Sequence, residues 1–109
     1  MSLEPRFAAD AMLGRLARWL RVLGYDTWYD IAVSDPDLVR LAAEEGRMLL
    51  TRDRHLLQEL RPERAHEVRR DEPLQQLREL VEALHLAPPH VRRMRAALER
   101  VLPGWGGPG

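Results

Sequence analysis

The feature that most constrains the fold of this 109-residue chain is a fourfold alternation of strand-like and helix-like segments. Short apolar or β-branched runs predict strands, and apolar residues spaced three and four apart predict the helices between them. The expected strands are residues 6–9, 25–30, 48–51 and 65–70, and the expected helices are residues 11–23, 35–46, 55–60 and 73–86. Such alternation favours an α/β fold with a mostly parallel four-stranded sheet and helices on both faces.

Local signals support these segments. Gly24 and Gly46 are expected to end the first two helices, since glycine readily adopts the backbone conformation of a helix C-terminus. Asp35 is expected as the N-cap of the second helix, with Pro36 at its first position. We expect the apolar stripe of the first helix, including Trp19, to lie in the core together with Trp28.

Composition excludes several classes of phosphate-handling protein. All seventeen basic residues are arginine, so the chain has no P-loop lysine and lacks the lysine on which receiver domains and dehalogenase-like phosphatases rely. Gly14 and Gly24 do not form a dinucleotide-binding motif. The absence of cysteine excludes disulfides and thiolate metal sites. The formal net charge is zero, which argues against a protein that coats nucleic acid but allows a local arginine-lined site.

Hydropathy indicates a protein with no membrane partner. No apolar run is long enough to cross a bilayer, and the first ten residues carry charges instead of the apolar core of a secretory signal. We therefore expect a cytoplasmic location.

Acidic residues follow the predicted strands. Asp10 follows the first strand, Asp53 the third and Asp71 the fourth, while Asp35 and Asp37 begin the helix after the second. In a parallel sheet these positions share one rim, where ligands bind at the point of strand-order reversal. If the first and third strands flank that point, Asp10 and Asp53 lie across it from each other.

These carboxylates also have a simpler interpretation. Aspartate is a common N-cap, which accounts for Asp35 and Asp71 without any function. Asp10 is different, because its apolar neighbours predict burial, and a buried carboxylate needs an arginine, another cation or a metal ion. Mg²⁺ or Mn²⁺ is the expected ion for a cluster of carboxylates.

Arginines accompany the acidic positions. Arg15, Arg18 and Arg21 recur along the first helix, and Arg52 and Arg54 flank Asp53. Phosphate contact and a solvated helix face are both open for Arg15 and Arg18, whereas the solvated face is favoured for Arg21 and Arg54.

Two stretches, FAADAMLGRLARWLRVLGYDTWYD and SDPDLVRLAAEEGRMLLTRDRHLL, closely resemble the PIN-like ribonuclease domain of the Mut-seven C-terminal family. The resemblance covers about residues 6–80 and implies a PIN-like three-layer sandwich that cleaves RNA, expected to be single-stranded, with Mg²⁺ or Mn²⁺. By position it implies catalytic roles for Asp10, Asp35 and Asp53, metal binding by these three with Asp37 and Asp71, and substrate binding by Arg15, Arg18, Thr51 and Arg52.

A break at Pro88-Pro89 divides the chain. Residues 1–87 would form the PIN-like domain, residues 88–102 an added basic helix packed on it, and residues 103–109 a flexible tail. Many family members carry a cysteine zinc ribbon at the C-terminus, and this chain has arginines there instead. The alternative function is a non-catalytic module that keeps the fold for binding RNA or a protein partner.

Overall fold

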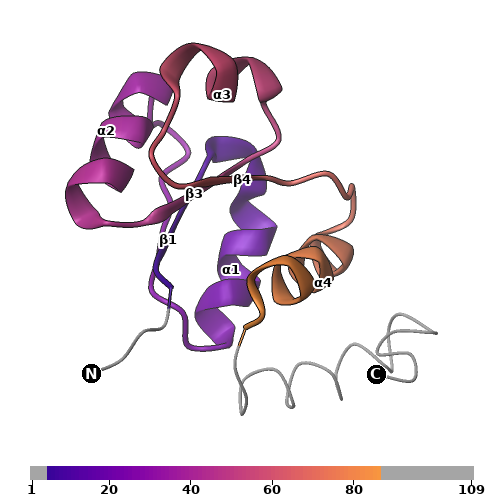
Figure 1. Ribbon diagram of the computed structural model, residues 1–109. Helices are drawn as coiled ribbons and strands as arrows, with labels where there is room; N and C mark the ends of the chain where they lie inside the picture. The colour runs from indigo at the N-terminus through magenta and orange to yellow at the C-terminus, as the bar shows by residue number, and fades with distance from the viewer. Residues whose placement is uncertain (1–4, 87–109) are drawn as a thin grey trace.

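The computed structural model describes residues 5–86, in which a β-sheet lies between two layers of helices (Figure 1). The elements in chain order are β1 (Phe7–Ala9), the 3₁₀ helix η1 (Ala11–Leu13), α1 (Gly14–Val22), β2 (Thr27–Trp28), α2 (Asp35–Glu45), β3 (Met48–Thr51), α3 (Arg54–Leu60), β4 (Ala65–Glu67) and α4 (Pro73–Leu84). The predicted α/β class is confirmed, and the arrangement is that of a PIN-like sandwich. The helix predicted at 90–102 and the tail at 103–109 lie outside the described residues.

The four strands are all parallel and lie in the order β2-β1-β3-β4. Ala9 is in register with Leu50, and Thr51 is in register with Glu67. The chain leaves β1 for β2 on one side and reaches β3 on the other, so strand order reverses between β1 and β3. This is the switch point that the sequence predicted, and ligands bind at such points in open parallel sheets.

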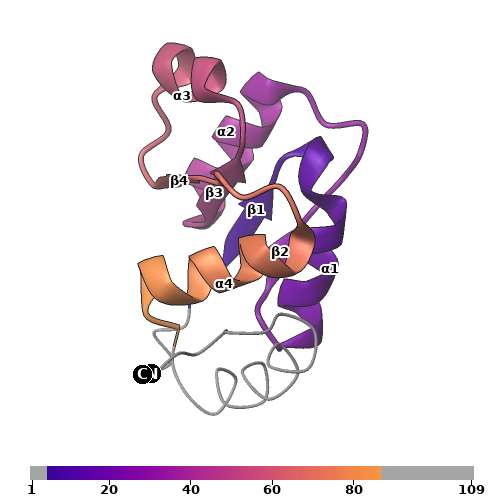
Figure 2. The ribbon, with the colours of Figure 1, turned by 90° about the vertical axis from the view of Figure 1, so that its right-hand side faces the viewer.

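Alternate residues of the two central strands enter two separate cores. Phe7, Ala9 and Leu50 pack against α1 and α4, and Figure 2 shows α4 crossing the sheet with α1 beside it. Ala8 and Leu49 point to the other face and pack with the helices α2 and α3. All five residues have no exposed surface, as expected for central strands of a parallel sheet covered on both faces.

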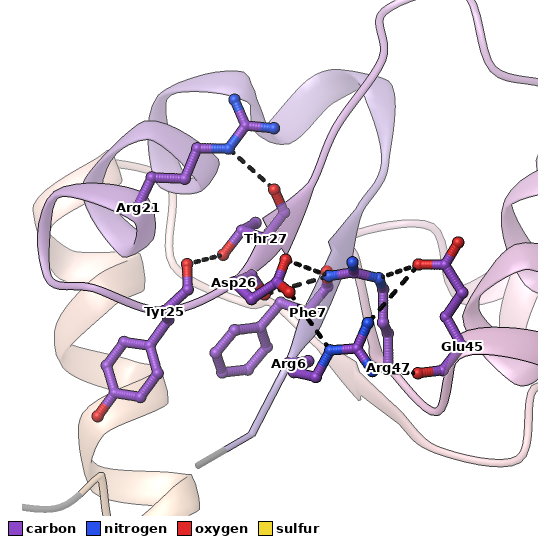
Figure 3. Close-up of polar contacts among 8 residues, drawn as sticks. All are labelled: Arg6, Phe7, Arg21, Tyr25, Asp26, Thr27, Glu45 and Arg47. Carbon is purple, nitrogen blue, oxygen red and sulfur yellow. Dashed lines mark hydrogen bonds and ion pairs between the residues drawn. The ribbon is translucent and has the colours of Figure 1, made fainter. Parts of the chain in front are cut away.

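Ion pairs connect the residues at the end of the sheet where the strands begin, opposite the end where ligands bind in such sheets (Figure 3). The buried Arg47 donates to Glu45 at 2.7 Å, to the Asp26 carboxylate at 2.9 Å and to the Phe7 carbonyl at 3.0 Å. Arg6 approaches the other oxygen of Asp26 at 3.4 Å. The hydrogen bond from Arg47 holds the pKa of Asp26 below its usual value; burial opposes this, and the charges of both arginines add to it.

Several local predictions are wrong in detail. Ser34, not Asp35, caps α2 and accepts a hydrogen bond from the Asp37 N–H, and Glu72 rather than Asp71 precedes α4 as its N-cap. The second strand is two residues long because the chain leaves the sheet after Trp28. Trp19, predicted to be in the core, is 36% exposed. The predicted helix ends are confirmed, since Gly24 and Gly46 have positive φ.

Within residues 5–86, no helix has the length and apolar character needed to cross a membrane.

Candidate active site

Asp10 directly follows β1, at the strand-order reversal. Its backbone N–H continues the sheet ladder by donating to Leu50 O at 3.0 Å, so the strand geometry places its side chain at the rim. The residue is only 7% exposed. One carboxylate oxygen, Oδ1, accepts from the Met12 N–H at 2.8 Å and thereby caps η1.

Thr51 connects Asp10 to the next strand. It ends β3, has no exposed surface, and donates its hydroxyl to Asp10 Oδ2 at 2.5 Å. The same Thr51 oxygen accepts the Asp53 N–H at 3.0 Å. One buried hydroxyl therefore links the two aspartates that follow the central strands. Thr51 is fully buried and holds Asp10 in place. Its role in substrate binding stays a prediction.

Asp53 lies at the surface directly after this link. Its Oδ1 accepts from the backbone N–H groups of His55 at 2.9 Å and Leu56 at 3.1 Å, which makes it the N-cap of α3. The second oxygen, Oδ2, has no hydrogen-bond partner within residues 5–86. The cap therefore orients the carboxylate while leaving one oxygen available at the rim.

Tyr29 supports the Asp10 loop, a role that the sequence did not indicate. Its hydroxyl donates to the Ala11 carbonyl at 2.8 Å. The ring lies so close to Gly14 that a Cβ there would be 2.9 Å from the tyrosine oxygen. The glycine of the DAMLG stretch is thus explained by packing from the loop after β2. A contact between the loop after β2 and the start of α1 leaves no signal in sequence spacing.

The other predicted carboxylates have separate environments. Asp35 is exposed in the first turn of α2, and Asp37 pairs with Arg40 in the same helix. Asp71 pairs with Arg52 at 2.6 Å. Nowhere in the described part of the chain do three or more acidic or histidine side chains gather closely enough to hold a metal ion.

The loop that carries Asp71 is fixed by α4. Glu79 accepts the backbone N–H groups of Arg69 and Arg70, each at 3.0 Å, and shares a 2.5 Å hydrogen bond with His66 of β4. Burial raises the pKa of Glu79, but the hydrogen bonds from His66 and from the two backbone groups outweigh it and hold that pKa below the usual value. The loop is therefore anchored at the same rim as Asp53.

Arg15 and Arg18 are exposed on α1, beyond η1. Neither has a carboxylate within ion-pair distance among residues 5–86. Both guanidinium groups are therefore available for an anion. Arg52 is available only in exchange for Asp71, and an ion pair between such exposed groups is worth no more than about 1 kcal/mol.

This geometry defines an α/β protein of the PIN-like kind, with a buried carboxylate at the switch point of a parallel sheet. The family model described as the Mut7-C RNAse domain matches residues 5–99. The chain belongs to that family, which indicates a ribonuclease-type function and RNA as the substrate. No curated protein and no solved structure gives a match.

Proposed function

We propose that this protein hydrolyses phosphodiester bonds of RNA at the rim between β1 and β3, with Asp10 as the central catalytic group. The observation that carries the proposal is the fixed, buried carboxylate of Asp10, linked through Thr51 to Asp53, in a member of a ribonuclease family. Met12 N–H and the Thr51 hydroxyl are neutral donors, so they orient the carboxylate without cancelling its charge. A bound cation, or a proton transferred during the reaction, would therefore have the Asp10 carboxylate as a charged partner.

The donor set fits a divalent ion held by few protein ligands. Mg²⁺ usually binds one or two carboxylates and fills its remaining positions with water and substrate phosphate. Asp10 has one further lone pair on each oxygen, and Asp53 Oδ2 is free of partners in the described chain. When bound, Mg²⁺ or Mn²⁺ would polarise a phosphoryl oxygen and lower the pKa of its water.

The remaining acidic residues would act at longer range. Asp35 would contribute through water, as a third member of the catalytic set. Asp37 and Asp71 would join only after leaving Arg40 and Arg52. This rearrangement costs little, because both ion pairs are exposed at the surface, where a pair is worth no more than about 1 kcal/mol.

The chain's own residues would have two roles, phosphate binding and orientation of the two aspartates. Arg15 and Arg18 would hold the phosphates beside the scissile bond, and Arg52 would join them by exchanging its Asp71 partner for phosphate. Thr51 and the Asp53 N-cap keep the two aspartates at fixed positions, which supplies the orientation that an in-line attack by water requires.

The second candidate function is a module that binds RNA or a protein partner without cleaving it. The observation that favours it is the absence of any three-carboxylate cluster within residues 5–86. It differs from the proposal in one measurable respect, which is cleavage that depends on a divalent ion.

The test separates cleavage from binding. Asp53→Asn should reduce Mn²⁺-dependent cleavage of single-stranded RNA by at least about 100-fold, on the order of a general acid–base or metal-ligand contribution. RNA affinity should be unchanged or higher, because a group that repels phosphate has been neutralised. Arg15→Ala and Arg18→Ala should instead weaken binding and lower its salt dependence. Glu44→Gln, at an exposed position on α2, is the matched control and should behave as the parent. A folded parent that binds RNA but shows no metal-dependent cleavage would establish the binding module.

A further inference from the structure

The outer face of α1 exposes apolar side chains that a solvated helix normally lacks. Met12 is 82% exposed, Trp19 36% and Val22 70%. They belong to one continuous segment, η1 and α1, whose inner side buries Leu16 and Leu20. Trp19, which helical spacing predicted to be in the core, therefore presents part of its side chain at the surface.

The same face carries positive charge without compensation. Residues 11–25 contain three arginines and no acidic residue. Elsewhere in residues 5–86, the arginines within ion-pair distance of a carboxylate are Arg6, Arg40, Arg47, Arg52, Arg54 and Arg78. Arg15, Arg18 and Arg21 have no such partner in that part of the chain. Arg21 donates only to the Thr27 carbonyl at 2.8 Å, which leaves its charge in place (Figure 3).

Helix geometry combines these two features into one surface. Arg15 and Trp19 are four residues apart, as are Arg18 and Val22, and side chains at this spacing are neighbours on a helix. The surface begins beside the candidate active site, because the Met12 N–H is bonded to Asp10. It extends about 10 Å from Arg15 to Val22 at the rise of an α-helix, which is about 1.5 Å per residue.

We propose that this α1 face, formed by Met12, Arg15, Arg18, Trp19 and Val22, binds single-stranded RNA leading away from Asp10. One unpaired base would stack on Trp19, while Arg15 and Arg18 hold the adjacent phosphates. The inference rests on the proposed function and deepens it by assigning a strand path and a base-stacking residue. Charge complementarity favours RNA over a protein partner, since the face has no acidic group to match a mixed-charge surface. Stacking favours a single strand over a duplex, whose bases are already stacked.

The experiment compares two probes in EDTA, where cleavage stops. One is a short labelled single-stranded RNA, and the other is an oligonucleotide of the same length with abasic ribose units. Trp19→Ala should weaken binding of the RNA roughly 5- to 150-fold, the range for loss of one base–aromatic stack. It should leave binding of the abasic probe and the salt dependence unchanged. Trp19→Phe should recover most of the affinity, because it keeps a ring.

The control variants separate stacking from charge. Arg18→Ala should weaken binding of both probes and reduce the slope of log affinity against log salt by about 0.7, the value for one phosphate of a single strand. Arg64→Ala removes an exposed arginine before β4, near the far edge of the sheet, and should change neither probe's affinity. Ile31→Ala removes an exposed apolar side chain outside α1 and should also be silent.

The outcomes distinguish this inference from the proposed function. Equal affinity of the parent for the normal and abasic probes overturns the stacking site, even if Trp19→Ala fails to fold. Self-association of the parent that Trp19→Ala abolishes, with RNA affinity unchanged, also overturns it and assigns the face to a second copy of the chain. If the parent neither binds nor cleaves RNA, the proposed function fails and this inference fails with it.

Discussion

At the scale of single residues, Asp10 shows how a carboxylate can be buried without a permanent counter-charge. The sequence suggested an arginine, another cation or a metal as its partner. In the structure its two oxygens accept from a backbone N–H and from the Thr51 hydroxyl. Such donors offset the loss of hydration while preserving the negative charge, which is what a cation-binding or catalytic carboxylate requires.

Substitution of Thr51 tests whether its hydroxyl holds Asp10 in this arrangement. Thr51→Val keeps the shape of the side chain but removes a donor to buried Asp10 and an acceptor for Asp53 N–H. We expect the free energy of unfolding in urea to fall by about 1–3 kcal/mol. Cleavage should fall further than stability explains, because Asp10 loses its orientation. Thr51→Ser retains the hydroxyl and should recover most of both; equal loss in Ser and Val variants would mean that the methyl group matters and the hydrogen bond does not.

At the scale of elements, the start of α1 is set by packing rather than helix propensity. Alanine normally favours a helix over glycine by about 1 kcal/mol. At position 14, however, a Cβ would meet the Tyr29 ring, whose hydroxyl holds the Ala11 carbonyl. The close approach of Tyr29 to the start of α1 therefore outweighs the helix preference for alanine.

A double-mutant cycle measures that competition. Gly14→Ala should lower the thermal unfolding temperature of the parent, since Tyr29 must move. In a Tyr29→Ala background the same substitution should raise it, because only the helix propensity remains. The same sign of the change in both backgrounds would contradict the packing explanation.

The ion pairs where the strands begin predict a pH dependence. Arg47 lowers the pKa of Asp26 in the folded state from its ordinary 3.8. A lowered pKa contributes stability above the unfolded-state value, and this contribution disappears as pH falls through the folded value. Urea unfolding of the parent and of Asp26→Asn should therefore differ most above about pH 5, and the difference should shrink as the pH falls below 3.8, the ordinary pKa of Asp26. The difference should stay within about 1 kcal/mol, because the Asp26 side chain is 59% exposed. A difference that does not vary with pH would exclude this ion pair as its source.

Sequence patterns predicted the elements well where one local signal dominated. Apolar alternation, Gly24 and Gly46 placed the strands and helix ends, because burial and positive φ leave few alternatives. The patterns failed where two neighbouring residues could each be the N-cap of α2. Ser34, which precedes Asp35, is the N-cap in the structure. The prediction for Trp19 was wrong because helical spacing identifies an apolar residue but does not show how much of its ring the neighbouring side chains cover.

Only those features of the candidate site that follow from sheet topology could be predicted from the sequence. Parallel strands bring their ends to one edge, so alternation predicted that Asp10 and the end of β3 share one rim. That β1 and β3 are neighbours in the sheet is shown only by the structure. The Thr51 link, the Tyr29 support and the pairing of Arg52 with Asp71 depend on side-chain directions that spacing does not encode. The metal ion and the catalytic set stay predictions.

At the scale of the whole molecule, the two edges of the sheet differ in charge organisation. The edge where strands begin is closed by Arg6, Arg47 and their carboxylates, which neutralise one another. The rim where strands end has Asp10 without a cationic partner in residues 5–86, and the arginines of α1 extend from it. Neutralised ion pairs thus lie at one edge of the sheet, and uncompensated charge suited to an ion and a polyanion lies at the other.

The most direct test of the metal site is the anomalous difference map of a crystal soaked in Mn²⁺. We expect a peak about 2.2 Å from an oxygen of Asp10, with Asp53 bound directly or through one water, and no such peak in Asp10→Asn crystals soaked identically. Few protein ligands and several waters should complete the coordination. Bound Mn²⁺ elsewhere on the protein, with the rim accessible to solvent and no peak beside Asp10, would contradict a metal site at Asp10.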